Sequence, residues 1–414
     1  MSSVKDIRLA HQGRLKIEWA EAHMPVLMEI KKEFARKKPF KGVTVGFALH
    51  VTKETAVLVR TLIAGGAKVA IAGCNPLSTQ DDVAAALASE GVDVYAWRGQ
   101  SNQEYYENIK KVLSHNPQIT IDDGGDLVFT VHKERRDLIA KMKGGCEETT
   151  TCVIRLRAME KDNALEYPVI ATNDAETKHL FDNHYGTGQS TMDGILRSTN
   201  ILFSGKTVVV AGYGWCGKGV AMRARGLGSD VVVCEVNPVK ALQAVMDGYR
   251  VMPMEKASRI GDLFVTTTGN VDVITGAHVK NMKDNAVLCN SGHFNVEINI
   301  KDLEKLSKGK KAIRENVEMY TLKNGRRIYL LAEGRLVNLA AAEGHPSEVM
   351  DMSFADQALA CKYVSENKLK PGVYKVPEEI DHLVARMKLK TMGVDVDSLN
   401  PRQKKYLDSW EEGT

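Results

Sequence analysis

The chain has 414 residues, of which 43% are hydrophobic and 26% are charged, a composition typical of two or three globular domains with substantial cores. Its 56 basic and 52 acidic residues leave a net charge of +4, without a basic stripe rich in aromatic residues, so we expect no nucleic-acid partner. No apolar run approaches the roughly 18 residues of a membrane span, and the N-terminus is charged, which favours a cytoplasmic protein with no membrane partner. The seven cysteines contain no Cys-x-x-Cys pair, which indicates reduced thiols and neither a disulfide framework nor a metal site.

Predicted helices and strands alternate along the first part of the chain. A helical region over 15–38 is followed by predicted strands at 42–49, 68–73, 92–97, 119–123, 152–159 and 169–173, with helices at 54–65, 81–91, 101–114 and 134–143 between them. This alternation is typical of a parallel sheet with crossover helices. The sequence therefore predicts one complete α/β domain before residue 200.

A glycine-rich turn then follows a run of β-branched residues. Gly212, Gly214 and Gly217 have the Gly-x-Gly-x-x-Gly spacing in which a strand passes through a tight turn into a helix that binds a dinucleotide pyrophosphate. A second apolar run, 231–234, ends in Glu235, near the spacing at which a carboxylate binds ribose hydroxyls. Because a carboxylate there repels a 2′-phosphate, the pattern favours NAD over NADP.

Further strands are predicted at 263–267 and 286–289, a long helix at 349–367, and a charged helical region over 377–410. The predicted fold class is therefore α/β, with two doubly wound, Rossmann-like parallel-sheet domains facing a cleft and a helical C-terminal tail.

Polar clusters follow several of the predicted strands, at 50–55, 74–80 and 122–126, and another, 147–151, precedes one. Ligands of open parallel sheets bind beyond the carboxyl ends of the strands. Any single cluster is also explained by a helix cap or a turn. Their repetition at equivalent sheet positions favours a site.

These segments carry a resemblance to the S-adenosyl-L-homocysteine hydrolase (adenosylhomocysteinase) family that spans nearly the whole chain. The matching segments are 49–58, 75–81, 94–97, 122–127, 147–151, 181–183, 212–219, 265–269, 292–294, 331–339 and 344–347. The resemblance implies a hydrolase with tightly bound NAD. It also implies that the protein is a cytoplasmic homotetramer and acts in the methyl cycle of one-carbon metabolism.

The implied reaction is the reversible hydrolysis of S-adenosyl-L-homocysteine to adenosine and L-homocysteine. The ribose 3′-hydroxyl is oxidised first, which acidifies the hydrogen on C4′ and permits elimination of homocysteine from C5′. Water then adds to the enone, and the retained hydride is returned.

Roles carried over from the family fall on matching positions of this chain. The implied catalytic residues are His50, Asp123, Glu148, Lys178, Asp182, Asn183 and His293. Substrate contacts are implied for Thr52, Glu54, His345, Met350 and Phe354, together with Asp123, Glu148, Lys178 and Asp182. NAD contacts are implied for Thr149, Thr150, Thr151, Asn183, Gly212, Gly214, Gly217, Glu235, Asn270, Asn338 and His345.

The resemblance also implies a division into domains. Residues 1–183 and 346–376 would form the substrate-binding domain, 184–345 the NAD-binding Rossmann domain, and 377–414 a C-terminal tail that contacts other subunits. The crossings near 183–188 and 343–346 would act as a paired hinge.

The chain departs from the family pattern at three places. Thr187 stands where many relatives have Cys, Glu343 stands where many have Met, and the chain lacks the common C-terminal Lys and Tyr that reach a neighbouring NAD site. Glu343 and the altered tail keep open a preference for S-inosyl-L-homocysteine. Two rival functions also stay open, that of a catalytically silent regulatory relative and that of a conventional NAD dehydrogenase.

Overall fold

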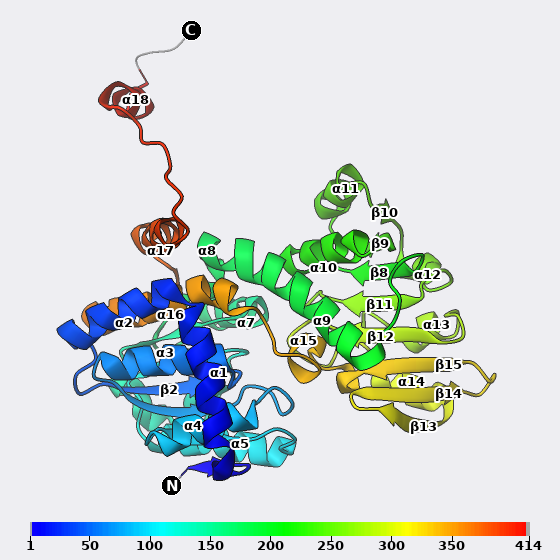
Figure 1. Cartoon of the computed structure of the whole chain (residues 1–414), viewed down its shortest axis with the longest axis horizontal. Coiled ribbons are helices and arrows are strands. Elements are labelled where there is room, and N and C mark those ends of the chain that lie inside the picture. The colour runs from blue at the N-terminus through cyan, green and yellow to red at the C-terminus, as the bar shows by residue number, and fades with distance from the viewer. Residues whose placement is uncertain (1, 411–414) are drawn as a thin grey trace.

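The computed structural model describes residues 2–410 and contains two sheets of eight strands each, with helices on both faces (Figure 1). The carboxyl ends of the central strands of both sheets border one cavity between them. The predicted α/β class with two Rossmann-like sheets is therefore confirmed, although the second sheet also contains an antiparallel part.

The first sheet is parallel throughout, in the order β1-β4-β3-β2-β5-β6-β7-β16. Its strands are β1 (Ser3–Val4), β2 (Thr44–Ala48), β3 (Lys68–Ala72), β4 (Asp93–Ala96), β5 (Ile119–Asp122), β6 (Gly144–Glu147), β7 (Pro168–Ala171) and β16 (Gly372–Lys375). The chain reverses its direction across the sheet between β2 and β5. Such a switch point opens a crevice beyond the strand ends, where open α/β sheets bind ligands.

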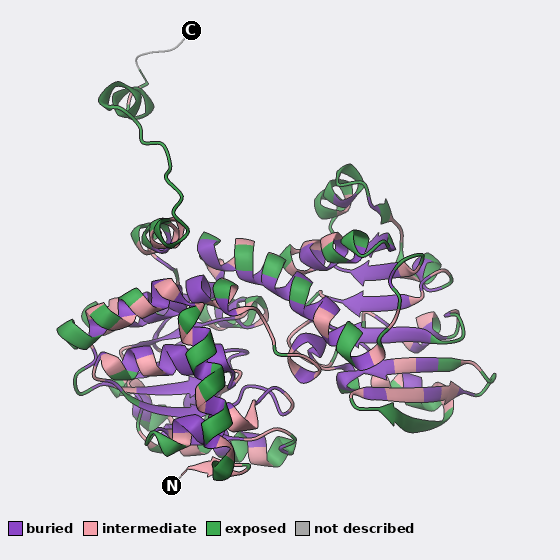
Figure 2. Cartoon of the chain, viewed as in Figure 1, coloured by how far each residue is buried: buried purple, intermediate pink, exposed green. Residues whose placement is uncertain are grey.

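Two apolar clusters cover the two faces of this sheet. Its helices are α1 (Ala10–Ala22), α2 (Pro25–Lys37), α3 (Lys53–Ala64), α4 (Asp81–Ser89), α5 (Asn102–Ser114), α6 (Asp126–Glu134), α7 (Thr150–Lys161), α16 (Ser347–Glu366) and α17 (Glu378–Thr391). Helix α16 comes from the far end of the chain and packs against α2, α3 and β6. Figure 2 shows the central strands and most of α16 buried.

The second sheet has the order β10-β9-β8-β11-β12-β15-β14-β13. Its strands are β8 (Thr207–Ala211), β9 (Asp230–Cys234), β10 (Arg250–Val251), β11 (Leu263–Thr266), β12 (Ala286–Asn290), β13 (Ser307–Arg314), β14 (Val317–Leu322) and β15 (Arg327–Leu331). The strands from β10 to β15 are parallel, whereas β14 and β13 extend the sheet as an antiparallel meander. Its switch point lies between β8 and β11.

The helices of the second sheet are α9 (Thr187–Thr199), α10 (Trp215–Gly226), α11 (Pro238–Met246), α12 (Met254–Ala257), α13 (Gly276–Val279), α14 (Ile300–Leu306) and α15 (Val337–Ala340). One long helical crossing leads to it from the first sheet. It consists of α8 (Glu176–Lys178), a π-helical segment (His179–Gly186) and α9. In a π-helix, residues five apart lie on one face, and Lys178 and Asn183 therefore meet side by side.

Beyond α17 the chain leaves the body of the molecule and ends in the exposed α18 (Pro401–Leu407) (Figures 1 and 2). The tail predicted over 377–414 extends into residues 411–414, which lie outside the described residues. Among the described helices, none is long and apolar enough to cross a membrane.

Three predicted elements were wrong in detail. The helix expected over 15–38 is two helices, because Pro25 is the first residue of α2 and disfavours helical geometry in the residue before it. The segment 152–159 is the helix α7 rather than a strand, and its buried residues 152, 153 and 156 have helical spacing. Instead of one helix over 134–143, α6 ends at Glu134 and a 3₁₀ turn follows.

The short helix α8 is held in place by a carboxylate from α17. Asp381 accepts hydrogen bonds from the backbone N–H groups of Glu176 (2.6 Å) and Thr177 (2.9 Å), and from the Thr177 hydroxyl. These groups are among the helix donors that have no partner within the helix itself. Asp381 thereby fixes the start of the helical crossing that carries Lys178.

We predict that Asp381→Ala lowers the free energy of unfolding by about 1–2 kcal/mol, because it removes an N-terminal cap. Denaturant titration followed by circular dichroism measures the change. Glu379→Ala is the matched control, since Glu379 is an exposed carboxylate on the same helix. Equal stability of the two variants would contradict the capping role.

Candidate functional site

The two switch points face each other across a cavity of about 1400 Å³. The predicted site residues that line it are His50, Thr52, Glu54, Asp123, Glu148, Thr149, Thr150, Thr151, Lys178, Asp182, Asn183, Gly212, Gly214, Glu235, Asn270, His293, Asn338, His345, Met350 and Phe354. Gly217 does not line it. The structure thus brings together residues that come from just over 300 positions of sequence, between 50 and 354.

Lys178 is the buried cation at the centre of the cavity wall. Its Nζ lies 2.8 Å from Asn183 Oδ1, 3.3 Å from Glu148 Oε1 and 3.5 Å from Asp182 Oδ2. Burial alone lowers the pKa of a lysine, but the charges of Asp182 and Glu148 outweigh it and raise the pKa of Lys178 above its usual value. The side chain is therefore held as an ammonium, ready to donate a hydrogen bond into the cavity.

Asp182 is held by three side chains. Lys178 is its cationic partner, His345 Nδ1 lies 2.9 Å from its Oδ1, and the Ser353 hydroxyl donates to its Oδ2 at 2.7 Å. Burial opposes ionisation, yet Lys178 and His345 together lower the pKa of Asp182 well below its usual range. Asp182 is thus the fixed negative charge that keeps Lys178 protonated.

The pKa of Glu148 is shifted in the opposite direction to that of Asp182. Burial raises the pKa of Glu148 to about 8, although the Lys178 ammonium opposes this shift. Its Oε2 accepts a hydrogen bond from Gln357 Nε2 at 2.6 Å. A carboxyl group with a pKa near neutrality can both donate and accept hydrogen bonds with a pair of ribose hydroxyls.

A second group of ionisable side chains lies at the ends of β2, β5 and β12. His50 Nε2 is 3.2 Å from Asp123 Oδ2, and His293 Nδ1 is 3.4 Å from Asp123 Oδ1. Burial lowers the pKa of His50 to about 4, against the opposing charge of Asp123. His50 is therefore a neutral imidazole at pH 7, and its Nδ1 is held 2.6 Å from the Ser78 hydroxyl.

The cofactor half of the cavity is built on the glycine turn. Gly212 has φ +99°, a conformation that strains any side chain, and a Cβ on Gly217 would lie 2.0 Å from the Gly212 carbonyl oxygen. Gly217 therefore acts by letting α10 pack against the turn. A Cβ on Gly214 would meet nothing within 4 Å, so the backbone there is open to the cavity at the N-terminus of α10, where a pyrophosphate fits.

Glu235 follows β9 and faces this turn. Its Oε2 accepts a hydrogen bond from the Tyr213 N–H at 2.7 Å, and its Oε1 accepts from the N–H groups of Val236 and Asn237. These three backbone bonds fix a negative charge where an adenosine ribose lies in such folds. The arrangement fits NAD and disfavours a 2′-phosphate.

At the other end of the turn, polar groups are arranged for an amide-bearing ring. Asn338 Oδ1 is buried and receives no hydrogen bond from any described residue, while its Nδ2 donates to Ser190 and contacts His345. A buried acceptor without a partner is costly unless a ligand donates to it. The carboxamide NH₂ of NAD is a donor of that kind.

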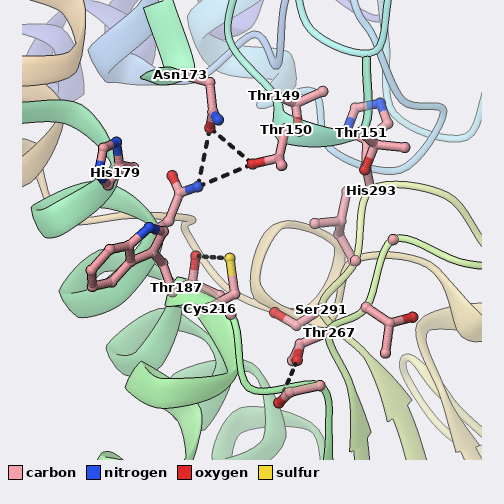
Figure 3. Close-up of a pocket in the computed structure, with 18 of the residues that line it drawn as sticks. Thr149, Thr150, Thr151, Asn173, His179, Thr187, Cys216, Thr267, Ser291 and His293 are labelled. Carbon is pink, nitrogen blue, oxygen red and sulfur yellow. Dashed lines mark hydrogen bonds between the residues drawn. The ribbon is translucent and has the colours of Figure 1, made fainter. Parts of the chain in front are cut away.

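The wall between the two halves is shown in Figure 3. Asn173 Oδ1 accepts hydrogen bonds from Thr150 Oγ1 and Asn183 Nδ2, both at 3.1 Å. Thr149 and Thr151 come from the same helix start and line the cavity, and Thr151 lies next to Gly269 beyond β11 of the second sheet. Asn270 lies at the exposed rim, with its own side chain bonded to the next N–H group.

The remaining end of the cavity combines apolar side chains with the buried carboxylate of Glu54 and, at its exposed edge, the carboxylate of Glu343. Met350 and Phe354 extend from α16 over the start of α3, where Thr52 is the N-cap and Glu54 is buried. The Ser347 hydroxyl donates to Glu54 Oε1 at 2.6 Å. An apolar slot with a buried carboxylate acceptor suits a flat heterocycle that carries a donor on its edge.

Several residues that hold the site were missed by sequence reasoning. Ser78, Asn173, Ser353 and Gln357 hydrogen-bond to the predicted groups. For Gln357 a signal was present, because it lies three and seven residues after Phe354 and Met350 and so on the same helical face. Ser78 lies in the predicted polar cluster 74–80 but was given no role, and Asn173 and Ser353 follow no pattern of spacing.

We predict that the burial of neutral His50 makes the protein sensitive to mild acid. Between the unfolded pKa of 6.5 and the folded value of about 4, the unfolded chain binds more protons, so stability falls as the pH falls. Relative to pH 7, the wild type should lose about 2 kcal/mol more than His50→Gln at pH 5. Urea titrations at both pH values measure this difference.

His11→Gln serves as the control for this titration, because His11 is exposed. It should follow the wild type at both pH values. An equal loss of stability in His50→Gln and the wild type would show that His50 is not buried in its neutral form.

Comparison with known proteins agrees with this site. Residues 1–138 match the family model described as S-adenosyl-L-homocysteine hydrolase, and 183–344 match the model for its NAD binding domain. The chain is 61% identical to S-inosyl-L-homocysteine hydrolase of Methanocaldococcus jannaschii, with 100% of both chains covered. It is 60% identical to adenosylhomocysteinase of Sulfurisphaera tokodaii, with 99% of both covered. The chain therefore belongs to the S-adenosyl-L-homocysteine hydrolase family, and its second sheet is the NAD-binding domain of that family.

Proposed function

We propose that this enzyme catalyses the reversible hydrolysis of S-adenosyl-L-homocysteine to adenosine and L-homocysteine, with NAD as a resident cofactor. The observation that carries the proposal is that Lys178 and the His50–Asp123 pair line one cavity together with the glycine turn. A dehydrogenase that exchanges its cofactor needs a group such as Lys178 beside the nicotinamide, but it does not need the His50–Asp123 pair. The His50–Asp123 pair has a use if a bond elsewhere on the substrate is broken.

The bound NAD supplies a hydride acceptor for the ribose 3′-hydroxyl, and the resulting ketone makes the C4′ hydrogen acidic. The Lys178 ammonium would donate a hydrogen bond to the 3′-oxygen and act as the general acid that returns its proton when the ketone is reduced, with Asp182 fixing the ammonium and Asn183 orienting it. Glu148 would bind the ribose hydroxyls, since its raised pKa lets it donate as well as accept. These four side chains form the oxidation end of the site.

Elimination of homocysteine needs proton transfer at C4′ and C5′. Asp123 would act near C4′, and His50, a neutral base held by Ser78, would serve the leaving sulfur and the entering water at C5′. His293 comes from the second sheet and contacts the other Asp123 oxygen. The group of His50, Asp123 and His293 is therefore complete only when the two sheets face each other closely.

The end of the cavity lined by Glu54, Met350 and Phe354, which we call the base end, favours adenine. The Glu54 carboxylate is an acceptor, and adenine offers a 6-amino donor on its edge. S-inosyl-L-homocysteine is the second candidate substrate, because relatives named for either compound are 60–61% identical to this chain. Overall identity thus favours neither base. A silent regulatory relative is disfavoured, since every proposed catalytic position is filled.

The broader assignments are also proposals. We propose a cytoplasmic homotetramer that acts in the methyl cycle of one-carbon metabolism. Residues 1–183 with 346–376 would bind substrate, 184–345 would bind NAD, and the tail over 377–414 would contact neighbouring subunits. The family matches support the first two segments, and the exposure of α18 supports the third.

The proposed function predicts thiol release without an external oxidant. Purified protein should carry NAD and release homocysteine from S-adenosyl-L-homocysteine, detected with a thiol reagent, while free NADH does not accumulate. S-inosyl-L-homocysteine is measured beside it. Release of one NADH for each substrate consumed would instead identify a dehydrogenase.

Lys178 and His50 are expected to act in different steps of the reaction, so their variants should slow different steps. Lys178→Ala should slow reduction of the bound cofactor by adenosine by about 10²–10⁴-fold, the usual contribution of a general acid or base. His50→Asn should still permit that reduction but impair thiol release. Stopped-flow absorbance and thiol assays measure the two steps, and His11→Gln is the exposed control. Wild-type reduction rates in Lys178→Ala would overturn its role.

A further inference from the structure

An ion pair crosses from the first sheet to the hinge beside the base end of the cavity. Lys53 Nζ lies 3.2 Å from Glu54 Oε1 and 3.0 Å from Glu343 Oε2. The Lys53 side chain is 10% exposed, whereas that of Glu343 is 53% exposed. Glu343 precedes the segment that returns the chain to α16, so this contact joins the two halves of the molecule.

The backbone around the pair is fixed as well. Gln80 Oε1 accepts a hydrogen bond from the Lys53 N–H at 3.2 Å, and Gln80 Nε2 donates to the Glu343 carbonyl at 3.4 Å. One glutamine therefore sets the separation of the two charged residues. Arg197 Nη2 approaches the outer oxygen of Glu343 at 3.5 Å, on the solvent side.

The electrostatics show that Lys53 is shared between two carboxylates. Burial alone lowers the pKa of Lys53, but Glu54 and Glu343 together raise it. The hydrogen bond from Lys53, followed by its charge, lowers the pKa of Glu343. The ammonium is thus shared between Glu54 and Glu343 and is not paired with Glu54 alone.

Glu54 consequently keeps one oxygen for a ligand. Its Oε1 receives the Ser347 hydroxyl and the Lys53 ammonium, while Oε2 receives no hydrogen bond from the described residues. Glu54 and Glu343 line the cavity, and Lys53 does not. A purine at this end therefore meets a carboxylate oxygen, with the ammonium held behind it.

We propose that Glu343 determines which purine the enzyme accepts, by holding the Lys53 ammonium off the base so that Glu54 favours a 6-amino purine over a 6-oxo purine. A 6-amino group donates to a carboxylate, whereas a 6-oxo group places an acceptor against it. Without Glu343, the ammonium is free to neutralise Glu54 or to donate to the 6-oxo group. The inference rests on the proposed function and deepens it.

The test is a double-mutant cycle on the ratio of kcat/KM for S-adenosyl- to S-inosyl-L-homocysteine. Glu343→Gln keeps the shape but removes the charge, and the ratio should fall about tenfold or more, the usual effect of one charged hydrogen bond. Lys53→Met removes the ammonium, so in the Glu343→Gln background it should restore a ratio near or above that of the wild type. Calorimetric binding of adenosine and inosine to the NAD-loaded proteins should follow the same order.

Two controls isolate the Lys53 contact. Arg197→Gln removes only the outer partner of Glu343, and Glu348→Gln removes a carboxylate five residues away, so both should keep the wild-type ratio. A ratio within twofold of wild type in Glu343→Gln, or a fall that Lys53→Met does not reverse, overturns the inference. A wild type that releases thiol from neither compound would instead refute the proposed function and the inference with it.

Discussion

The burial of the Lys178 ammonium is the constraint on which the site depends. A buried charge is tolerated only where other groups compensate its lost hydration. Asp182 and Asn183, on the same helical crossing, supply part of this compensation, and Glu148 supplies another part from the end of β6. Removing any one of them leaves a charge without sufficient partners. The helical crossing, β6 and α16 therefore have to be correctly placed relative to one another.

Helix α16 shows how this constraint reaches the far end of the sequence. Its Ser353 donates to Asp182, and its Gln357 donates to Glu148. The chain has to build the whole second sheet and then return before these bonds exist. The crossing and the return are therefore the covalent links between the sheets and also the supports of the cation. A small rotation of one sheet against the other would separate His293 from Asp123.

The sequence allowed the parts of the site with local causes to be predicted. The glycine turn, Glu235 and the clusters after β2 and β5 follow from strand and turn chemistry, and the structure brings them to one cavity. Pro25 carried a boundary signal that was overlooked, and in α7 the apolar residues fit a short strand until their helical spacing is counted. The antiparallel meander of β13–β15 was not anticipated either, because β13 is largely exposed and β14 only partly buried. Supporting bonds such as Ser78 to His50 join residues 28 positions apart, and no local pattern encodes them.

The residues that select the purine base are also far apart in sequence, so no local pattern encodes their arrangement. Identities of 60–61% to relatives named for either nucleoside do not separate the two substrates. The electrostatic setting of the Glu54 carboxylate depends on Lys53 and Glu343, which are 290 positions apart in sequence. Because Glu343 lies on the segment that returns the chain from the second sheet to α16, its contact with Lys53 depends on the same approach of the two halves that brings His293 to Asp123. Substrate choice and assembly of the proton-transfer groups are therefore coupled through a single geometric requirement.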